Sequence, residues 1–213
     1  TDPIDRKADL LNEILPDNPN MAYDMYKVIG AITDNGEFFE VQAKFAKNII
    51  VGFARFNGQS VGIVANQPSC YAGVLDTNAS RKAARFVRFC DAFNIPVLSL
   101  TNVKGYEATL CSEKKIAKAV AKLTYAFANA TVPKVNVIIG KAYGSAYVAM
   151  NSKAIGADIT ICWPDAEIGS MDATLAAKIM YDGQSADVVK EQAAEYARYA
   201  DGYFSLSISM FDV

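Results

Sequence analysis

The sequence predicts a single α/β domain in which strands and helices alternate along the chain. Five short apolar segments have strand length, and they lie at 49–56, 60–65, 97–101, 135–139 and 159–162. Amphipathic segments with helical spacing separate the later ones, which is typical of βα units and a largely parallel sheet. Asn57-Gly58 lies between the first two segments and is a strong hairpin signal, so one antiparallel element is also expected.

The chain is predicted to divide into a connector at 1–25 and a domain at 26–213. The segment 15–20 has the turn-forming composition of a tether, and the apolar residues before it could form a short amphipathic turn. A short helix at 24–34 and a strand at 38–41 then open the domain.

The helical spacing of apolar residues predicts two longer helices. Asn78 or Ser80 is available as the N-cap of the first, and Pro96 ends it; the second ends before Pro133. Their apolar faces comprise Ala83, Phe86, Val87, Cys90 and Phe93, and then Ile116, Val120, Leu123 and Phe127. A short helix is expected at 145–153 and a polar one at 187–200. The alternating apolar run at 205–211 indicates either a truncation or a partner surface.

Composition excludes several classes of function. Lys and Arg are dispersed, so no nucleic-acid surface is expected, and no apolar stretch reaches the ~18 residues that membrane insertion requires. The four cysteines form no CxxC pair, which favours free thiols in the cytoplasm over a disulfide framework or a metal site. Histidine is absent, which excludes Ser-His-Asp and Cys-His catalysis.

The most informative segment is 137–147, where a buried strand runs into a small-residue turn that opens a helix. At such a junction the first backbone N–H groups have no intrahelical acceptor and favour negative charge, either a bound anion or a developing oxyanion. The small residues Gly144, Ser145 and Ala146 would let a ligand approach the backbone closely. A tight turn that only packs against the sheet would have the same pattern. Ser145 is not expected to be a nucleophile, because no base is available to activate it.

Similar turns follow two other predicted strands, at 66–73 and at 102–106. All three lie beyond the C-terminal ends of strands, where α/β folds place their ligands. Asp165 and Glu167 could act as general bases, although such residues are more often solvated loop carboxylates.

Five segments carry a specific resemblance: Gly-Glu-Phe-Phe-Glu-Val at 36–41, Ala-Asn-Gln-Pro at 65–68, the run at 82–97, Ala-Thr-Val-Pro-Lys-Val at 130–135 and Lys-Ala-Tyr-Gly at 141–144. In order along the chain, they resemble the carboxyltransferase subunits of propionyl-CoA and related acyl-CoA carboxylases, a family that includes biotin-dependent decarboxylases such as the glutaconyl-CoA enzyme. The resemblance implies a crotonase-like ββα spiral fold and covers only the C-terminal, carboxybiotin-side domain of the family.

The resemblance also implies a site. The backbone N–H groups of Ser145 and Ala146, after Gly144, would hold the ureido oxygen of biotin and stabilise its enolate-like anion while CO₂ moves to or from an acyl-CoA. Cofactor contacts are expected from Tyr143, Gly105, Ala72, Gly73 and Val148. The implied partners are an N-terminal acyl-CoA-binding half, a biotin carboxyl carrier protein bearing carboxybiotin, and further copies of the chain in an oligomer.

The sequence departs from the family pattern at several positions. Ser145 replaces the second Gly of the turn, Lys104 replaces a Pro and Asp172 replaces a Gly, while glycines expected around 116–119 are missing. A backbone donor survives each exchange. Two other functions stay open: a stand-alone crotonase-fold hydratase or isomerase acting on acyl-CoA, and a non-catalytic assembly module.

Overall fold

A seven-stranded mixed sheet forms the centre of the molecule in a computed structural model that describes residues 1–3, 5–14, 16 and 21–208. The strands run in the order β1-β2-β3-β4-β5-β6, and β7 pairs with β5. Their bounds are β1 Phe38–Glu40, β2 Ile49–Phe56, β3 Gln59–Asn66, β4 Val97–Val103, β5 Lys134–Tyr143, β6 Ile159–Cys162 and β7 Glu167–Gly169. The first three pair antiparallel and all later pairs are parallel, which confirms the predicted α/β class.

The predicted hairpin joins β2 to β3. Asn57 and Gly58 have φ of 50° and 79°, a left-handed conformation that these two residue types tolerate best. The carboxylate of Asp34 accepts hydrogen bonds from both of their N–H groups, at 3.1 and 2.7 Å. This bonding lowers the pKa of Asp34.

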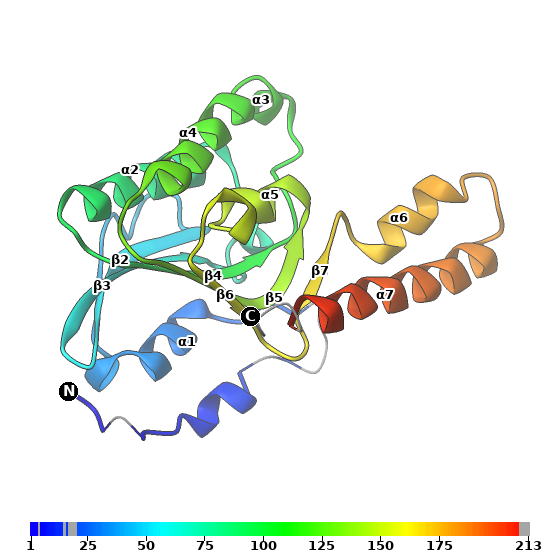
Figure 1. Cartoon of the computed structure of the whole chain (residues 1–213). Helices are drawn as coiled ribbons and strands as arrows, with labels where there is room; N and C mark the ends of the chain where they lie inside the picture. Colours follow the sequence, from blue (N-terminus) through cyan, green and yellow to red (C-terminus); the bar gives the residue numbers. More distant parts are fainter. Residues whose placement is uncertain (4, 15, 17–20, 209–213) are drawn as a thin grey trace.

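Both faces of the sheet are covered, which explains why its strands read as continuous apolar runs. Alternate residues of β2 point to opposite faces: Ile49 and Val51 belong to one core cluster, and Ile50 belongs to the other. The first cluster lies under α2 (Thr77–Ala92), α4 (Ile116–Asn129) and α5 (Gly144–Ala149), which lie together above the sheet in Figure 1. The second lies under α1 (Met25–Ile32) and the N-terminal segment on the opposite face.

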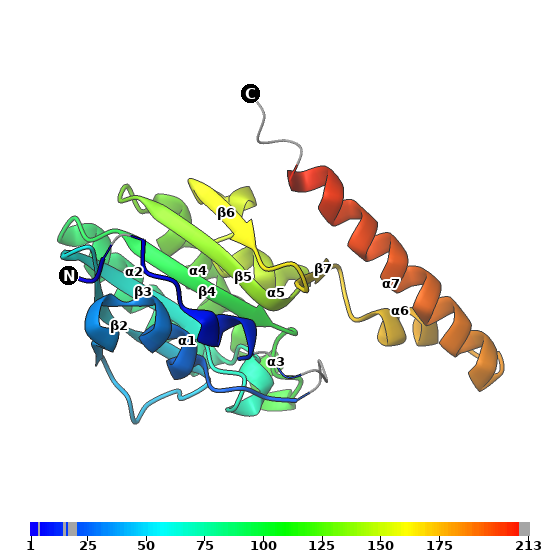
Figure 2. The same ribbon diagram turned by 90° about the horizontal axis from the view of Figure 1, so that it is seen from below.

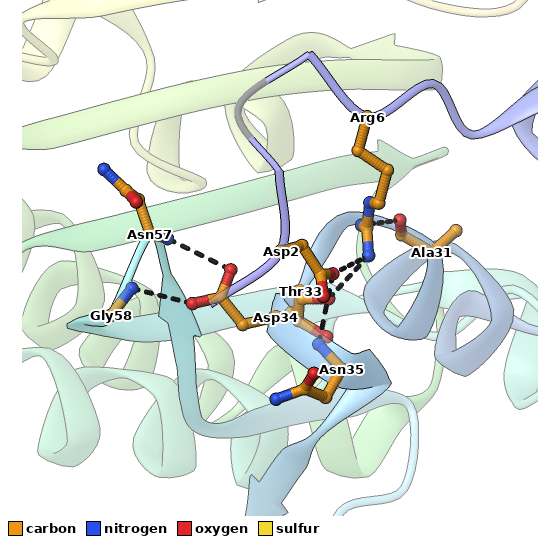
Figure 3. A network of polar contacts seen from close by, with 8 residues as sticks. All are labelled: Asp2, Arg6, Ala31, Thr33, Asp34, Asn35, Asn57 and Gly58. Atoms are coloured by element: carbon orange, nitrogen blue, oxygen red, sulfur yellow. Dashed lines mark hydrogen bonds and ion pairs between the residues drawn. The ribbon is translucent and has the colours of Figure 1, made fainter.

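The N-terminal segment lies along the domain. Its short 3-10 helix η1 (Asp9–Asn12) is followed by Ile14, which packs with Leu11 against the second core cluster. Figure 3 shows Arg6 bonded to Asp2 and to the backbone oxygens of Ala31 and Thr33. The 25/26 boundary between connector and domain stays a prediction, and the turn predicted at 15–20 lies, except for residue 16, outside the described residues.

Several predicted boundaries were wrong, each for a local reason. The N-cap of α2 is Asp76, whose carboxylate accepts the Ala79 N–H at 2.6 Å, and neither Asn78 nor Ser80 fills that position. β5 continues past residue 139 because Lys141 to Tyr143 pair with β7. The short helix ends at Ala149 and not at 153, because Asn151 leaves the helical conformation (φ 62°) and its side chain binds Ser99 and Val135.

A pair of helices projects from the β7 side of the body. α6 (Ala173–Met180) and α7 (Ala186–Ile208) pack against each other, and Figure 2 shows them extending away from the sheet. α7 includes the predicted helix at 187–200 and continues through residues 205–208 of the apolar run, whose remainder lies outside the described residues. Within the described part of the chain, no helix is both long and apolar enough to cross a bilayer.

The remaining short elements connect these parts. They are η2 (Asp34–Gly36), η3 (Tyr71–Gly73), α3 (Leu110–Glu113) and η4 (Lys153–Ile155).

Candidate functional site

The three predicted turns meet at one edge of the sheet, because β3, β4 and β5 are parallel and their C-terminal ends lie together. Leu75, just after the first turn, forms a parallel bridge with Tyr106 of the second. The Leu75 N–H donates to the oxygen of Gly105 at 3.0 Å, and the Glu107 N–H donates back to Leu75 at 3.0 Å. These bonds hold the first two turns together.

Tyr106 also connects to the third turn. Burial raises the pKa of its phenol, and the Ser145 side chain beside it opposes that rise. The Tyr106 hydroxyl is buried and makes no hydrogen bond of good geometry within the described residues. The Tyr106 hydroxyl is therefore a buried polar group that lacks a well-formed hydrogen bond, and it lies next to the turn at Gly144.

The turn at Gly144 joins β5 to α5, at the strand-to-helix junction that the sequence predicted. Gly144 has φ of +57°, and a Cβ there would lie 2.9 Å from the oxygen of Ser170, so glycine is required on two grounds. Its N-cap, Tyr143, makes no side-chain capping bond to the helix. Ser145 is exposed, whereas Ala146 is only 1% exposed. The first N–H groups of α5 are consequently not capped by a side chain of the N-cap residue.

The turn at 71–73 is unusual because three successive residues, Tyr71, Ala72 and Gly73, have positive φ (50°, 53° and 71°). Gly73 is buried, and a Cβ there would lie 2.7 Å from the Asn102 oxygen, while Ala72 is exposed. The N–H groups of Gly73 and Val74 donate within the turn, to the oxygens of Cys70 and Tyr71, both at 3.1 Å.

The other two predicted contact residues also lie at this edge. Gly105 has φ of +152°, and a Cβ there would point into open space. Val148 is half-buried on α5, one turn after Gly144, so that the two residues share a face of the helix.

A cleft of about 930 Å³ opens beside the turns, between the strand ends and the N-terminal segment. Of the residues predicted to contact biotin only Ala72 lines it, and the two candidate bases, Asp165 and Glu167, line it as well. Its other walls include Tyr23, Asn102, Lys104, Lys141, Trp163 and Glu167. Asn102 begins the turn predicted at 102–106, but no role in the site was predicted for it, nor for Tyr23 or Trp163, because nothing in their local pattern indicates that distant segments converge on them.

Glu167 is not a solvated loop carboxylate. It lies in β7 and accepts a hydrogen bond from the hydroxyl of Tyr143, which is only 6% exposed. Asp165 is exposed at the mouth of the cleft. The Glu167 carboxylate therefore orients the tyrosine that precedes the Gly144 turn, and this role competes with that of a free general base.

The described residues hold no cluster of three or more His, Cys, Asp or Glu that could bind a metal ion. Cys70, Cys90, Cys111 and Cys162 all have free thiols.

The model of the carboxyl transferase domain family matches residues 1–210 of the chain. The chain is 48% identical over 210 residues to the methylmalonyl-CoA decarboxylase subunit alpha of Veillonella parvula, covering 95% of this chain and 41% of that one. It is 55% identical over 185 residues to the propionyl-CoA carboxylase beta chain of Saccharopolyspora erythraea, covering 86% and 34%. The chain thus spans about two-fifths or less of the length of these relatives.

Solved structures of carboxylases and of a transcarboxylase have the same fold as this chain. A transcarboxylase 12S structure, described as a hexamer with methylmalonyl-CoA bound, superposes with a TM-score of 0.86 at 44% identity, covering 89% of this chain and 38% of that one. The beta subunit of Pseudomonas aeruginosa geranyl-CoA carboxylase gives a TM-score of 0.82 at 25% identity, covering 92% and 38%. The fold is the predicted crotonase-like one, and the chain belongs to the carboxyl transferase domain family.

Proposed function

We propose that this chain is the biotin-side half of a biotin-dependent acyl-CoA carboxyltransferase. One observation carries the proposal: the three turns predicted to contact biotin converge at one sheet edge, linked through Leu75, Tyr106 and Ser145. The names of the relatives, a propionyl-CoA carboxylase and a methylmalonyl-CoA decarboxylase, support the substrate class.

The residues present suit a ureido group. Its carbonyl oxygen needs N–H donors, and the exposed start of α5 offers those of Ser145 and Ala146 with the positive end of the helix behind them. The buried Tyr106 hydroxyl has hydrogen-bonding capacity to spare beside Ser145. Biotin, carried in as carboxybiotin, would supply the CO₂ that is transferred.

The chain's own contribution is electrostatic. The N–H groups of Ser145 and Ala146 would stabilise negative charge that develops on the ureido oxygen, and they need no reorganisation during the reaction. The backbone of Gly144 lies close to the Ser170 oxygen, and its conformation sets the direction of the two N–H groups that follow it. Tyr143, oriented by Glu167, forms the side of the turn that faces β7. A chain without histidine suits this mechanism because substrate and cofactor exchange the proton between them.

The acyl-CoA substrate would bind a second half, in keeping with the two-fifths or less of the relatives' length that this chain spans. The proposed partners are that acyl-CoA half, a biotin carboxyl carrier protein and further copies of the chain. The chain alone should give no turnover with free carboxybiotin and short acyl-CoA thioesters, because catalysis needs both reactants in register. Turnover at ordinary enzyme rates would favour a stand-alone enzyme.

The decisive comparison uses two substitutions at one position. Because Gly144 has positive φ, regular helical backbone begins at Ser145, and a first helical residue tolerates proline well. Ser145→Pro removes the N–H, whereas Ser145→Ala keeps it, and the exposed side chain leaves room for either. Proline at the buried Ala146 would instead disturb packing.

With the acyl-CoA half restored, Ser145→Pro should lower carboxyl transfer roughly 10²–10³-fold, the loss typical of removing one oxyanion donor. Ser145→Ala should retain most activity. Circular dichroism must show that both variants fold. If the alanine variant is inactive while the proline variant works, the side-chain hydroxyl is the functional group and the backbone mechanism is wrong.

A further inference from the structure

Asn102 lies at an irregularity between β4 and β5, close to all three turns. The two strands keep parallel register up to Thr101↔Ile138, but the next pair is Val103↔Ala142. Two steps along β4 (101 to 103) thus correspond to four along β5 (138 to 142). Gly140 lies within this bulge, and a Cβ there would lie 3.0 Å from the Asn102 side chain, so the glycine makes room for the amide.

The Asn102 side chain bridges two segments that are distant in sequence. Its Oδ1 accepts the Lys141 N–H at 2.9 Å, and its Nδ2 donates to the Tyr23 hydroxyl oxygen at 3.0 Å. The first bond replaces the ladder bond that the bulge interrupts, so it holds β5 where the strand turns toward Gly144.

The Asn102 backbone reaches the other turn. Its N–H donates to Oδ1 of Asn66 at 3.1 Å, and the fully buried Asn66 side chain donates in turn to the oxygen of Gly73 at 3.4 Å. The Asn102 oxygen fills the space that a Cβ at Gly73 would need. One residue therefore contacts the turn at 71–73 and holds the strand that leads into the turn at 144.

We propose that Asn102 is a positioning residue of the biotin-side site. Through its hydrogen bond to Tyr23, the N-terminal segment also helps to hold the turns in place. The inference rests on the proposed function. Tyr23 is well suited to this role because its hydroxyl oxygen accepts the Asn102 amide hydrogen bond at 3.0 Å from a separate segment of the chain. Asn102 acts through the turns and needs no contact with biotin.

Three variants test the proposal in the full chain. Asn102→Leu has a similar volume but removes both amide bonds. Asn102→Asp keeps an oxygen for the Lys141 N–H, and the Tyr23 hydroxyl can rotate to donate to the carboxylate. Asp34→Ala serves as the destabilised control, because it removes two hydrogen bonds at the β2–β3 hairpin, at the opposite end of β3 from Asn66.

Two measurements are needed on each variant. Amide hydrogen exchange over residues 140–146 reports on the end of β5 and the Gly144 turn. Calorimetric titration with free biotin reports on the site directly and needs no probe residue near the turns. Asn102→Leu should speed exchange at 140–146 selectively and weaken biotin binding roughly tenfold or more, because small displacements of a preorganised site are costly. Asn102→Asp should stay close to the wild type in both.

The outcomes separate the two proposals. Unchanged exchange at 140–146 in Asn102→Leu, a loss of biotin binding equal to that in Asp34→Ala, or an aspartate variant as defective as the leucine variant would each overturn the role of Asn102. Faster exchange at 140–146 in Asn102→Leu without any change in biotin affinity would also overturn the role of Asn102. If the wild-type chain binds no biotin at all, the proposed function fails, whereas the exchange data still decide whether Asn102 holds the turn.

Discussion

Lys82 offers a quantitative test of how the fold is held together, because it is a buried cation that donates hydrogen bonds to three backbone oxygens. It lies in α2 and is 2% exposed, and its ammonium donates to the oxygens of Phe45 and Ile49, both at 2.8 Å, and of Ala46 at 3.3 Å. These bonds fasten the loop between β1 and β2 to the helix. Burial lowers the pKa of Lys82, and the Glu40 carboxylate opposes this.

Lys82→Met keeps an apolar stem of similar length and removes the donor. The Ile49 oxygen would lose its charged partner inside the core, whereas the Phe45 oxygen would lose it in a part-buried place, on a residue that is 45% exposed. The Ala46 oxygen keeps the Ile49 N–H at 3.2 Å. A bond to a charged group contributes about 1.5–3 kcal/mol, and burial of the ammonium itself is unfavourable. We therefore expect the free energy of unfolding to fall by about 2–4 kcal/mol.

Urea denaturation followed by circular dichroism measures this change, with the slope of the transition unchanged if the variant stays two-state. Lys47→Met is the matched control: it is an exposed lysine in the same loop and should shift stability by less than ~0.5 kcal/mol. If both variants lose the same small amount, the three bonds contribute no net stability and the reasoning is wrong.

For other parts of the fold, the direction of the change in stability can be predicted. Burial raises the pKa of the Cys90 thiol to about 12 from 9.0. The contribution of this thiol to the free energy of unfolding is therefore complete below pH 9 and is lost as pH rises toward 12. Urea melts over this pH range should show a smaller loss of stability for Cys90→Ala than for the wild type. Asp76→Ala removes the α2 cap and should lower the unfolding free energy by about 1 kcal/mol, measured by the same melts against Asn78→Ala, which should have little effect. Gly52→Ala should destabilise the β1–β2 pair strongly, since its Cβ would lie 2.4 Å from the Phe39 oxygen; a soluble variant with an unchanged melting temperature would contradict the packing described. Chelator and reductant together should leave the thermal midpoint almost unchanged, and a fall of more than ~10 °C would reveal a metal or disulfide.

Periodicity predicted most elements because local signals agreed with the fold. The hairpin at Asn57-Gly58 and the two helices that contain Phe86 and Leu123 lie where spacing and turn chemistry placed them. The boundary errors arose where tertiary contacts decided: β7 extends β5, and Asn151 ends α5 through bonds to Ser99 and Val135. No periodic signal carries information about either contact.

The candidate site was predictable in part. The turns at Gly73, Gly105 and Gly144 could be found because small residues after strands are visible in the sequence, and family resemblance assigned them a ligand. Asn102 falls in the turn predicted at 102–106, but its role could not be found in the same way, since it depends on hydrogen bonds to Asn66, Lys141 and Tyr23, the last of them 79 residues away in sequence. The cleft likewise depends on how the N-terminal segment crosses the sheet.

The α6–α7 pair has a consequence for how the molecule opens. Its main contacts are internal and to β7, a three-residue strand, so the pair adds little to the two core clusters that stabilise the sheet. Segments of this kind usually open in subglobal fluctuations that need less free energy than global unfolding. Proteases and deuterium should therefore reach residues 173–198 while β2 to β5 are still intact. We therefore expect the α6–α7 pair to form a cooperative unit of lower stability than the sheet and its covering helices.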